Sequence, residues 1–150
     1  LFAAHMPAIF ATLMTILAGI GAAMQPPANG TLARSGSVIL AALISFGVGT
    51  VILLGIWATL DRTSPSTLKD VPWWAWTGGI YGVIFVSTSA YAAPRLGLAS
   101  MLTIAIAAQL AAALVIDHFG LIRLPETPIT AMRALGVLLV LAGVVLVRKG

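Results

Sequence analysis

Two amide side chains stand inside the first long apolar stretch of the sequence. Gln25 and Asn29 lie four residues apart in a run from about residue 8 to residue 33 that carries no charge. Residues four apart share one face of a helix, and polar groups at membrane depth are costly unless they face protein or a water-filled cavity. The two amides therefore predict a hydrogen-bonding site for a small substrate within a membrane.

Pro26 and Pro27 separate the two amides. Proline has no backbone N–H to donate, so two prolines in succession should kink or break the helix. Irregular backbone at membrane depth is tolerated where it lines a cavity, and we interpret the two prolines as a hinge for alternating access. The alternative is that Asn29 and Gly30 merely end a helix of about 17 residues.

Three other side chains are candidates for contact with the same substrate. Gln109 stands near the centre of a later apolar run, among alanines. A lone amide at such a position either holds two helices together or contacts a ligand. Tyr81 and Trp57 would offer aromatic surface, and the Tyr81 hydroxyl, near mid-membrane, needs a hydrogen-bond partner.

Asp117 and His118 are the only adjacent acidic residue and histidine near an apolar run. If transport is coupled to protons, these two side chains are the candidate groups. The alternative is that they mark an interfacial helix end, where charged groups normally lie. No nucleophile–base pair and no cluster of metal ligands is visible, so the sequence predicts no enzyme, no cofactor and no metal.

The composition places these residues in a membrane protein. Of the 150 residues, 60% are hydrophobic and 8% are charged, and the mean hydropathy is +1.08, whereas a soluble domain carries about 25% charged residues. The net charge of +4 does not indicate nucleic-acid binding, because the basic residues stand singly beside apolar runs, as topology determinants do. The absence of cysteine excludes disulfides, thiol catalysis and cysteine-ligated metals.

Five apolar runs are each long enough to cross a bilayer as a helix. They cover residues of about 8–33, 37–60, 72–93, 97–117 and 129–147. We therefore expect an all-α integral membrane protein with five transmembrane helices, in a single domain from residue 6 to residue 150. Ser37 is the expected N-cap of the second helix. Residues 1–5, before Met6, resemble a tag remnant.

The basic residues set no preferred orientation in the membrane. With five spans, the eight Lys and Arg residues divide four and four between the two sides. One side has Arg62, Lys69, Arg123 and Arg133, and the other has Arg34, Arg95, Arg148 and Lys149. Because orientation follows the Lys/Arg bias, the chain should insert both ways and pair as an antiparallel homodimer. The alternative is that weak biases in the native N-terminus fix one orientation.

The last apolar run provides the expected dimer contact. Gly136 and Gly143 lie seven residues apart on one side of it, and the rest of the run is mostly Leu and Val. Small residues let helices approach closely in membranes. These two glycines are therefore predicted to lie at the interface between two copies of the chain.

Several short patterns, in their order and spacing, resemble one known family. They are Gln25-x-x-x-Asn29, Ser45-Phe46-x-x-Gly49-Thr50, Gly78-Gly79-x-x-Gly82, Ala93-Pro94-Arg95-x-Gly97, Gln109 and Asp117-His118-Phe119-Gly120. The chain from Met6 to Arg148 resembles the small five-helix, YdcZ-type branch of the drug/metabolite transporter superfamily, formerly a domain of unknown function. The resemblance implies an antiparallel homodimer in the bacterial inner membrane that transports small organic molecules, without naming a substrate.

One departure from the superfamily concerns the first helix. Small multidrug exporters of the superfamily carry a membrane-embedded glutamate there, whereas this chain has Gln25 and Asn29 and no acid. Cation-for-proton exchange through a buried carboxylate is therefore not expected. The leading hypothesis is a secondary transporter subunit that works by alternating access. The alternative, from another class, is a non-transporting membrane scaffold or accessory subunit.

Overall fold

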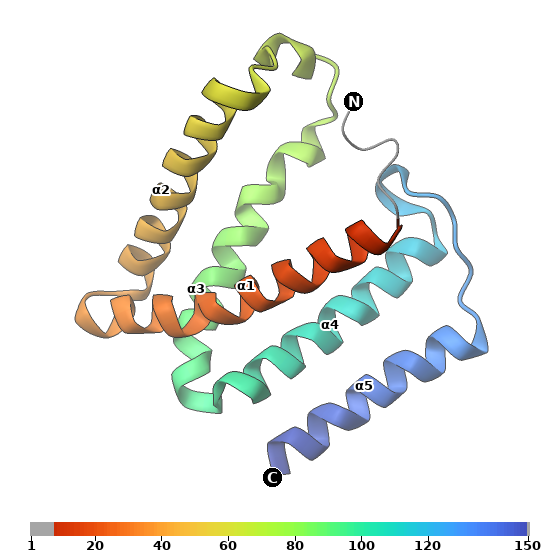
Figure 1. The fold of residues 1–150 in the computed structure, drawn as a ribbon. Helices are drawn as coiled ribbons and strands as arrows, with labels where there is room; N and C mark the ends of the chain where they lie inside the picture. The colour runs from red at the N-terminus through yellow and green to blue at the C-terminus, as the bar shows by residue number, and fades with distance from the viewer. Residues whose placement is uncertain (1–7, 150) are drawn as a thin grey trace. The chain divides into compact units, whose positions relative to one another are not determined.

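The computed structural model describes residues 8–149, and every regular element in that range is a helix (Figure 1). The expected all-α fold is therefore confirmed for the described residues. The chain divides into two compact units, the first ending at Arg95 and the second beginning at Leu96. The first unit contains α1, α2 and nearly all of α3, and the second contains α4 and α5. The predicted tag remnant, residues 1–5, lies outside the described residues.

α1 spans Ala8–Ser35 as one continuous helix. It passes through Pro26 and Pro27 without ending. Of the predicted kink or break, the break is therefore excluded, and the alternative that the helix ends just after the prolines is wrong. Each proline removes only one backbone hydrogen bond, and the bonds that remain are strongly favoured where no water competes for them. Arg34 stands in the last turn, where its cation complements the negative end of the helix dipole. A hinge at the prolines stays a prediction.

α2 spans Val38–Ile56 and begins at the predicted cap, because the Leu40 backbone N–H donates to Ser37 Oγ at 3.0 Å. The helix continues into a π-helical turn, Trp57–Asp61. Together the two segments agree closely with the second apolar run. α1 packs against α2 in the first unit.

α3 begins later than the sequence predicted. The run expected to start near residue 72 opens as a 3-10 helix, Trp73–Thr77, and becomes α-helical over Gly78–Leu96. A tight first turn of this kind is common at helix N-termini, and bulky aromatic side chains are weak α-helix formers because they lose rotamer freedom there. The preceding loop carries one more 3-10 turn, Pro65–Leu68, which is capped by the Ser64 side chain.

The second unit is an α-helical hairpin. Its elements are α4 (Leu98–His118), a 3-10 turn (Leu121–Arg123) and α5 (Ala131–Lys149). Gly97 precedes α4 with φ 81°, a conformation that glycine adopts most readily. α5 begins slightly later than predicted, because the Arg133 N–H donates to Thr130 Oγ1 at 3.3 Å and so caps the helix there. α4 and α5 pack side by side.

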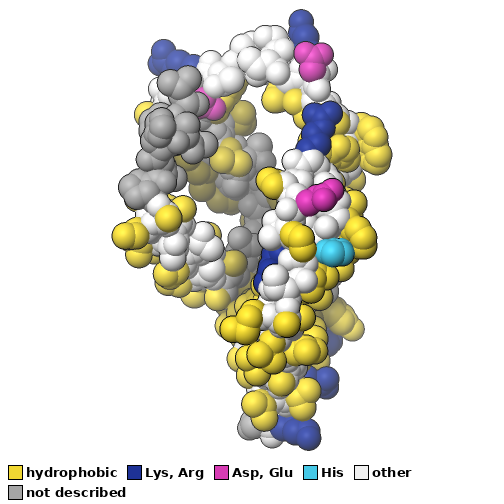
Figure 2. Space-filling view, turned by 90° about the vertical axis from the view of Figure 1, so that its right-hand side faces the viewer, with side chains coloured by type: hydrophobic (Ala, Val, Ile, Leu, Met, Phe, Trp, Pro, Cys, Tyr) yellow, Lys and Arg dark blue, Asp and Glu magenta, His cyan; other side chains and the backbone are white. Residues whose placement is uncertain are grey.

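The described helices present an apolar surface. Four of them are long and apolar enough to cross a membrane: α1, α2 with its π-helical turn, α4 and α5. α3 is less apolar, since Ser87–Ser89 interrupts it and Arg95 stands in its last turn. Large apolar side chains are mostly exposed, Leu53 at 66% and Leu138 at 60%, for example. Figure 2 shows such side chains on the surface, with few charged ones among them. A surface of this kind is suited to lipid.

The core of the first unit is built from small residues. Ala90 and Ala93 of α3 are buried, as is Ala41 of α2. An ideal Cβ on Gly30 of α1 would lie 3.5 Å from Pro94 Cγ and 3.6 Å from the Ala90 carbonyl oxygen. Small side chains let helix backbones approach closely, and here they bring the second half of α1 against the second half of α3.

Candidate functional site

A groove in the first unit brings Gln25 together with the middle of α2. Its volume is about 270 Å³. All three helices of the unit contribute to its lining, which consists of Gln25, Ser45, Phe46, Gly49, Thr50, Leu53 and Val86. One amide and two hydroxyls thus stand beside apolar side chains. Ligand sites commonly have this character, with a mostly apolar wall and a few placed polar groups.

The polar side chains of this groove differ from most of the threonines on the helices. Most helical threonines donate their hydroxyl to the backbone carbonyl four residues earlier, at 2.6–2.9 Å; these are Thr12, Thr15, Thr31, Thr59 and Thr103. Within the described range, the side chains of Gln25, Ser45 and Thr50 take part in no hydrogen bond with a protein group. Their donors and acceptors are therefore available to a ligand.

Asn29 lies one turn further along α1 and is buried. It is 2% exposed, and its Nδ2 has no hydrogen-bond partner within the described chain. Ser87 Oγ on α3 is also buried without a partner. An amide left in that state costs about 1–3 kcal/mol. Of the two amides that the sequence placed on one face, Gln25 lines the groove and Asn29 does not.

Phe46 forms a wall that the sequence analysis did not assign. An ideal Cβ on Gly82 would lie 3.0 Å from Phe46 Cζ, so the ring of α2 packs directly on the glycine backbone of α3. Phe46 lines the Gln25 groove and also a second groove of about 190 Å³, which Ala42 and Val83 line as well. Because Gly82 has no side chain, the Phe46 ring can pack against its backbone. The ring lines both grooves.

The two aromatic residues predicted to contact substrate are not part of the Gln25 groove. The Trp57 indole Nε1–H donates to the Thr63 carbonyl oxygen at 2.9 Å, and Trp57 is 40% exposed. Tyr81 is 67% exposed on α3. Phe46 supplies the aromatic surface of the groove instead. A substrate contact at Trp57 or Tyr81 stays a prediction.

Three other predicted residues belong to the second unit. Gln109 is exposed on α4. Gly136 and Gly143 of α5 have open space around them, since an ideal Cβ on either would meet no described atom within 4 Å. Their roles in substrate binding and in dimer contact stay predictions.

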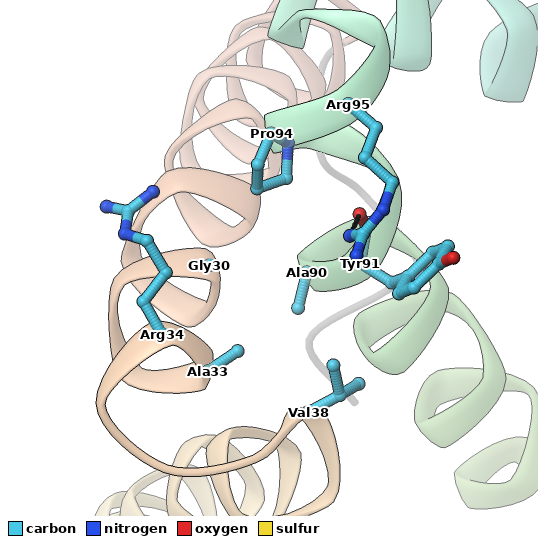
Figure 3. Close-up of a pocket in the computed structure, with 8 residues that line it drawn as sticks. All are labelled: Gly30, Ala33, Arg34, Val38, Ala90, Tyr91, Pro94 and Arg95. Carbon is cyan, nitrogen blue, oxygen red and sulfur yellow. Dashed lines mark hydrogen bonds between the residues drawn. The ribbon is translucent and has the colours of Figure 1, made fainter.

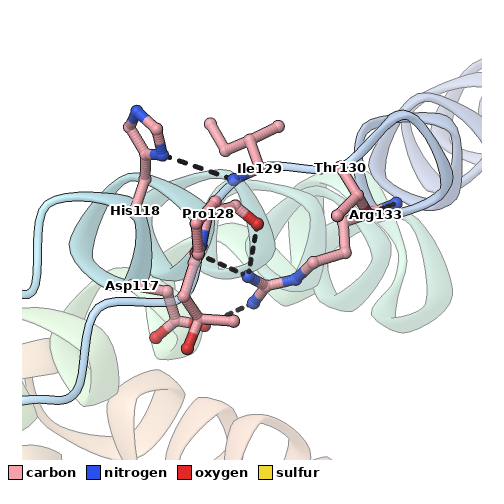
Figure 4. Close-up of polar contacts among 7 residues, drawn as sticks. Asp117, His118, Pro128, Ile129, Thr130 and Arg133 are labelled. Carbon is pink, nitrogen blue, oxygen red and sulfur yellow. Dashed lines mark hydrogen bonds and ion pairs between the residues drawn. The ribbon is translucent and has the colours of Figure 1, made fainter.

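Asp117 and His118 are engaged in holding α4 to the start of α5 (Figure 4). The Asp117 carboxylate forms an ion pair with Arg133, whose guanidinium also donates to the Thr127 carbonyl oxygen at 2.9 Å. His118 Nδ1 accepts the Ile129 backbone N–H at 3.3 Å. These contacts favour the interpretation of the pair as a helix end. Proton coupling by Asp117 and His118 stays a prediction.

Asp117→Asn should lower stability only slightly and leave transport intact. The ion pair with Arg133 is 34% exposed on each side, and pairs open to solvent contribute about 1 kcal/mol or less. Arg133→Gln should cost somewhat more, because it also removes the hydrogen bond to the Thr127 carbonyl oxygen, and the double variant should be little worse than Arg133→Gln, because the ion pair is lost only once. Thermal unfolding in detergent and proteoliposome transport measure the two quantities. Loss of transport in Asp117→Asn alone would point to proton coupling instead.

Apart from Gln25, the sequence analysis predicted none of the residues that line this groove as site residues: Ser45, Phe46, Gly49, Thr50, Leu53 and Val86. One signal was present, because Ser45, Phe46, Gly49 and Thr50 stand in a short pattern that contributed to the family resemblance. Nothing in that pattern indicated that it lies opposite Gln25. Leu53 and Val86 carry no such signal, since the helices hold many similar aliphatic residues.

Apolar helices of membrane-spanning length with a small polar groove among them define an α-helical integral membrane protein. The chain matches the family model DMT_YdcZ, described as "Putative inner membrane exporter, YdcZ", over residues 10–146. The protein therefore belongs to the YdcZ family, which confirms the resemblance and the inner-membrane location. The family is one of membrane exporters and not of enzymes, which supports a transporter role. No curated protein and no solved structure matched the chain.

Proposed function

We propose that the protein is a subunit of a secondary transporter that moves small organic molecules across the inner membrane. The groove around Gln25 carries this proposal. It combines an unbonded amide and two unbonded hydroxyls with apolar walls, within helices suited to lipid. A polar site on such helices is costly unless it serves a substrate or a water-filled path.

The lining of the groove indicates the class of substrate. No charged residue lines it, so it offers no ion pair to a charged molecule. An amide and hydroxyls both donate and accept hydrogen bonds, and Phe46 offers an apolar face. The substrate is therefore a neutral molecule with a polar end and an apolar body.

The size of the groove supports a site shared by two copies. Its volume of about 270 Å³ is below the range of about 300–1,000 Å³ usual for small-molecule pockets. In an antiparallel homodimer two such grooves would combine into one cavity near the membrane midplane, with Gln109, Tyr81 and Trp57 as further contacts. The open space at Gly136 and Gly143 would admit the partner's helix, and Pro26 and Pro27 would act as the hinge for alternating access.

Five spans would leave the two termini on opposite sides of the membrane, as the predicted topology has them, and we infer that α3 is the fifth span. Its 19 residues extend about 28 Å at 1.5 Å per residue, close to the bilayer core of about 30 Å. Its polar Ser87 and Ser89 would face protein, as polar groups in membrane helices do. Both are at least half-buried in the first unit.

Single cysteines can test whether the groove is reached from water, because the chain has none of its own. Cysteine at position 25 or 50 should react with a membrane-impermeant thiol reagent, and substrate should slow the reaction. Cysteine at position 29 should react more slowly, because Asn29 is buried. The measurement is the rate of labelling in vesicles, with reagent added from each side in turn.

Ile16→Cys is the matched control for this test. Ile16 is 54% exposed on the same helix, and as a lipid-facing residue it should resist the reagent. If positions 25 and 50 resist it as well from both sides, the site is dry, and the alternative of a non-transporting scaffold or accessory subunit is favoured.

A further inference from the structure

A third groove of the first unit has two arginines in its lining. It has a volume of about 370 Å³ and lies where the ends of α1 and α3 meet. Arg34 contributes from the last turn of α1 and Arg95 from the last turn of α3. Figure 3 shows the two side chains on opposite sides of the groove, each running back along its own helix. It shares no lining residue with the Gln25 groove.

Both guanidinium groups are held in place and keep most of their donors. Arg95 lies over the Tyr91 ring, with its central carbon 3.6 Å from the ring centroid, and its Nη1 donates to the Tyr91 carbonyl oxygen at 2.6 Å. Arg34 Nη2 donates to Thr31 Oγ1 at 3.0 Å. A guanidinium has five N–H donors, so most of the donors of each arginine remain free for an anion.

The groove has no carboxylate to neutralise it. None of its lining residues is acidic, and the acids of the first unit, Asp61 and Asp70, belong to the loop between α2 and α3. Each helix C-terminus carries about half a negative charge, so two ends offset about one of the two cations. About one positive charge is left over for a ligand.

The position of the groove indicates which anion it takes. Arg34 and Arg95 end the apolar parts of two helices, and Tyr91, half-exposed beside them, is a residue typical of the membrane–water interface. Phosphate groups lie at this level of a bilayer, and an arginine fork fits phosphate oxygens with two parallel hydrogen bonds. Apolar Gly30, Ala33 and Val38 form the floor of the groove, which suits the glycerol or acyl portion of a lipid.

We propose that this groove binds a phosphate group at the membrane surface, with Arg34 and Arg95 as its ligands. The phosphate of an anionic phospholipid headgroup and free inorganic phosphate share this chemistry. The site shares no lining residue with the Gln25 groove and does not depend on what that groove carries. A lipid held here would tie the ends of α1 and α3 together at the interface.

Lipid titration of the purified protein in detergent tests the proposal, with bound lipid counted by native mass spectrometry. The wild-type protein should retain phosphatidylglycerol in preference to phosphatidylcholine. The double variant Arg34→Gln/Arg95→Gln should lower the apparent affinity for phosphatidylglycerol by about 30-fold, as expected for two basic residues at an anionic headgroup. Arg34→Lys/Arg95→Lys keeps the charge but not the planar fork, so its loss should be intermediate.

A second arm separates the two sources of phosphate. Inorganic phosphate is titrated into lipid-depleted protein, and the shift in unfolding temperature is measured. Selective retention of phosphatidylglycerol assigns the site to a headgroup, whereas a saturable phosphate shift without lipid preference assigns it to the free ion. Either result supports the site only if Arg34→Gln/Arg95→Gln weakens that binding by about the factor given above.

The double variant Lys69→Gln/Arg148→Gln is the matched control, because it removes two cations that do not line the groove. It should bind both ligands as the wild type does. The proposal is overturned if this control loses as much affinity as Arg34→Gln/Arg95→Gln, since binding would then reflect net charge alone. It is also overturned if neither ligand distinguishes the wild type from the groove variant while circular dichroism shows both to be folded.

Discussion

Gln25→Leu should abolish substrate movement in proteoliposomes while leaving membrane insertion, folding and dimerisation intact. Gln25 is exposed in its groove and bonded to no described protein group, so its removal leaves no buried partner unsatisfied and should not destabilise the fold. Thr50→Val keeps the shape of the side chain and removes its hydroxyl, and it should weaken transport about fivefold, the equivalent of one neutral hydrogen bond. Initial transport rates over a range of substrate concentrations measure both effects.

Asn29→Leu is a sharper test of the neighbouring amide. Nδ2 of Asn29 is buried and unpartnered, so a purely structural Asn29 should be replaced by leucine without loss, or with a gain in unfolding temperature. If the amide instead meets substrate during transport, Asn29→Leu should stop transport while the protein stays folded. We expect the second result.

Thr12→Val is the control for the Gln25 groove. Thr12 lies on the same helix, and its hydroxyl already donates to the Ala8 carbonyl oxygen at 2.8 Å. Its replacement should leave transport unchanged. Equal losses in Thr12→Val and Thr50→Val would mean that the hydroxyls act through helix structure, and the groove would lose its assignment as the binding site.

Two added lysines should convert a mixed orientation into a single one. With four Lys and Arg residues predicted on each side, the wild-type chain lacks the excess of basic residues on one side that sets orientation under the positive-inside rule. Lysines placed between α1 and α2, near Gly36, should hold that side in the cytoplasm. Lysines placed between α2 and α3, near Ser66, should hold the opposite side there. Reporter fusions after Gly150, one active only in the cytoplasm and one only outside it, measure the two populations.

The wild-type protein provides the decisive comparison for orientation. Both reporters should be active when fused to the wild-type chain, and each lysine variant should leave only one of the two reporters active. A wild-type C-terminus found on one side only would rule out dual topology, and with it the antiparallel pairing of identical chains. Exchange of Ser66 for asparagine, which adds no charge, should leave the wild-type mixture unchanged.

The local sequence determined the helices because their causes are local. The apolar runs predicted where the helices lie, the cap at Ser37 acts within a few residues, and both appear in the structure. Three details differ from the prediction. They are the continuation of α1 through Pro26 and Pro27, the 3-10 opening of α3 and the later start of α5.

The candidate site could be predicted only in part, because its residues meet through packing between helices. The sequence singled out Gln25, but its place beside Ser45, Thr50 and Phe46 depends on the seating of the Phe46 ring on Gly82. A four-residue spacing put Gln25 and Asn29 on one face, yet it could not tell which amide the neighbouring helices would cover. Only the fold decided that Asn29 is buried and Gln25 exposed.

The sequence by itself determined that this protein is helical, membrane-embedded and a member of an exporter family, because composition and order of motifs carry that information without three-dimensional contacts. The tertiary structure decided which polar groups share a groove, which are held by other protein groups and which cations stand together. Asp117 is joined to Arg133, sixteen residues away, and Arg34 shares a groove with Arg95. Such pairings follow from how helices cross, and the crossing is set by small residues such as Gly30 and Ala90, whose close approach no single stretch of sequence specifies.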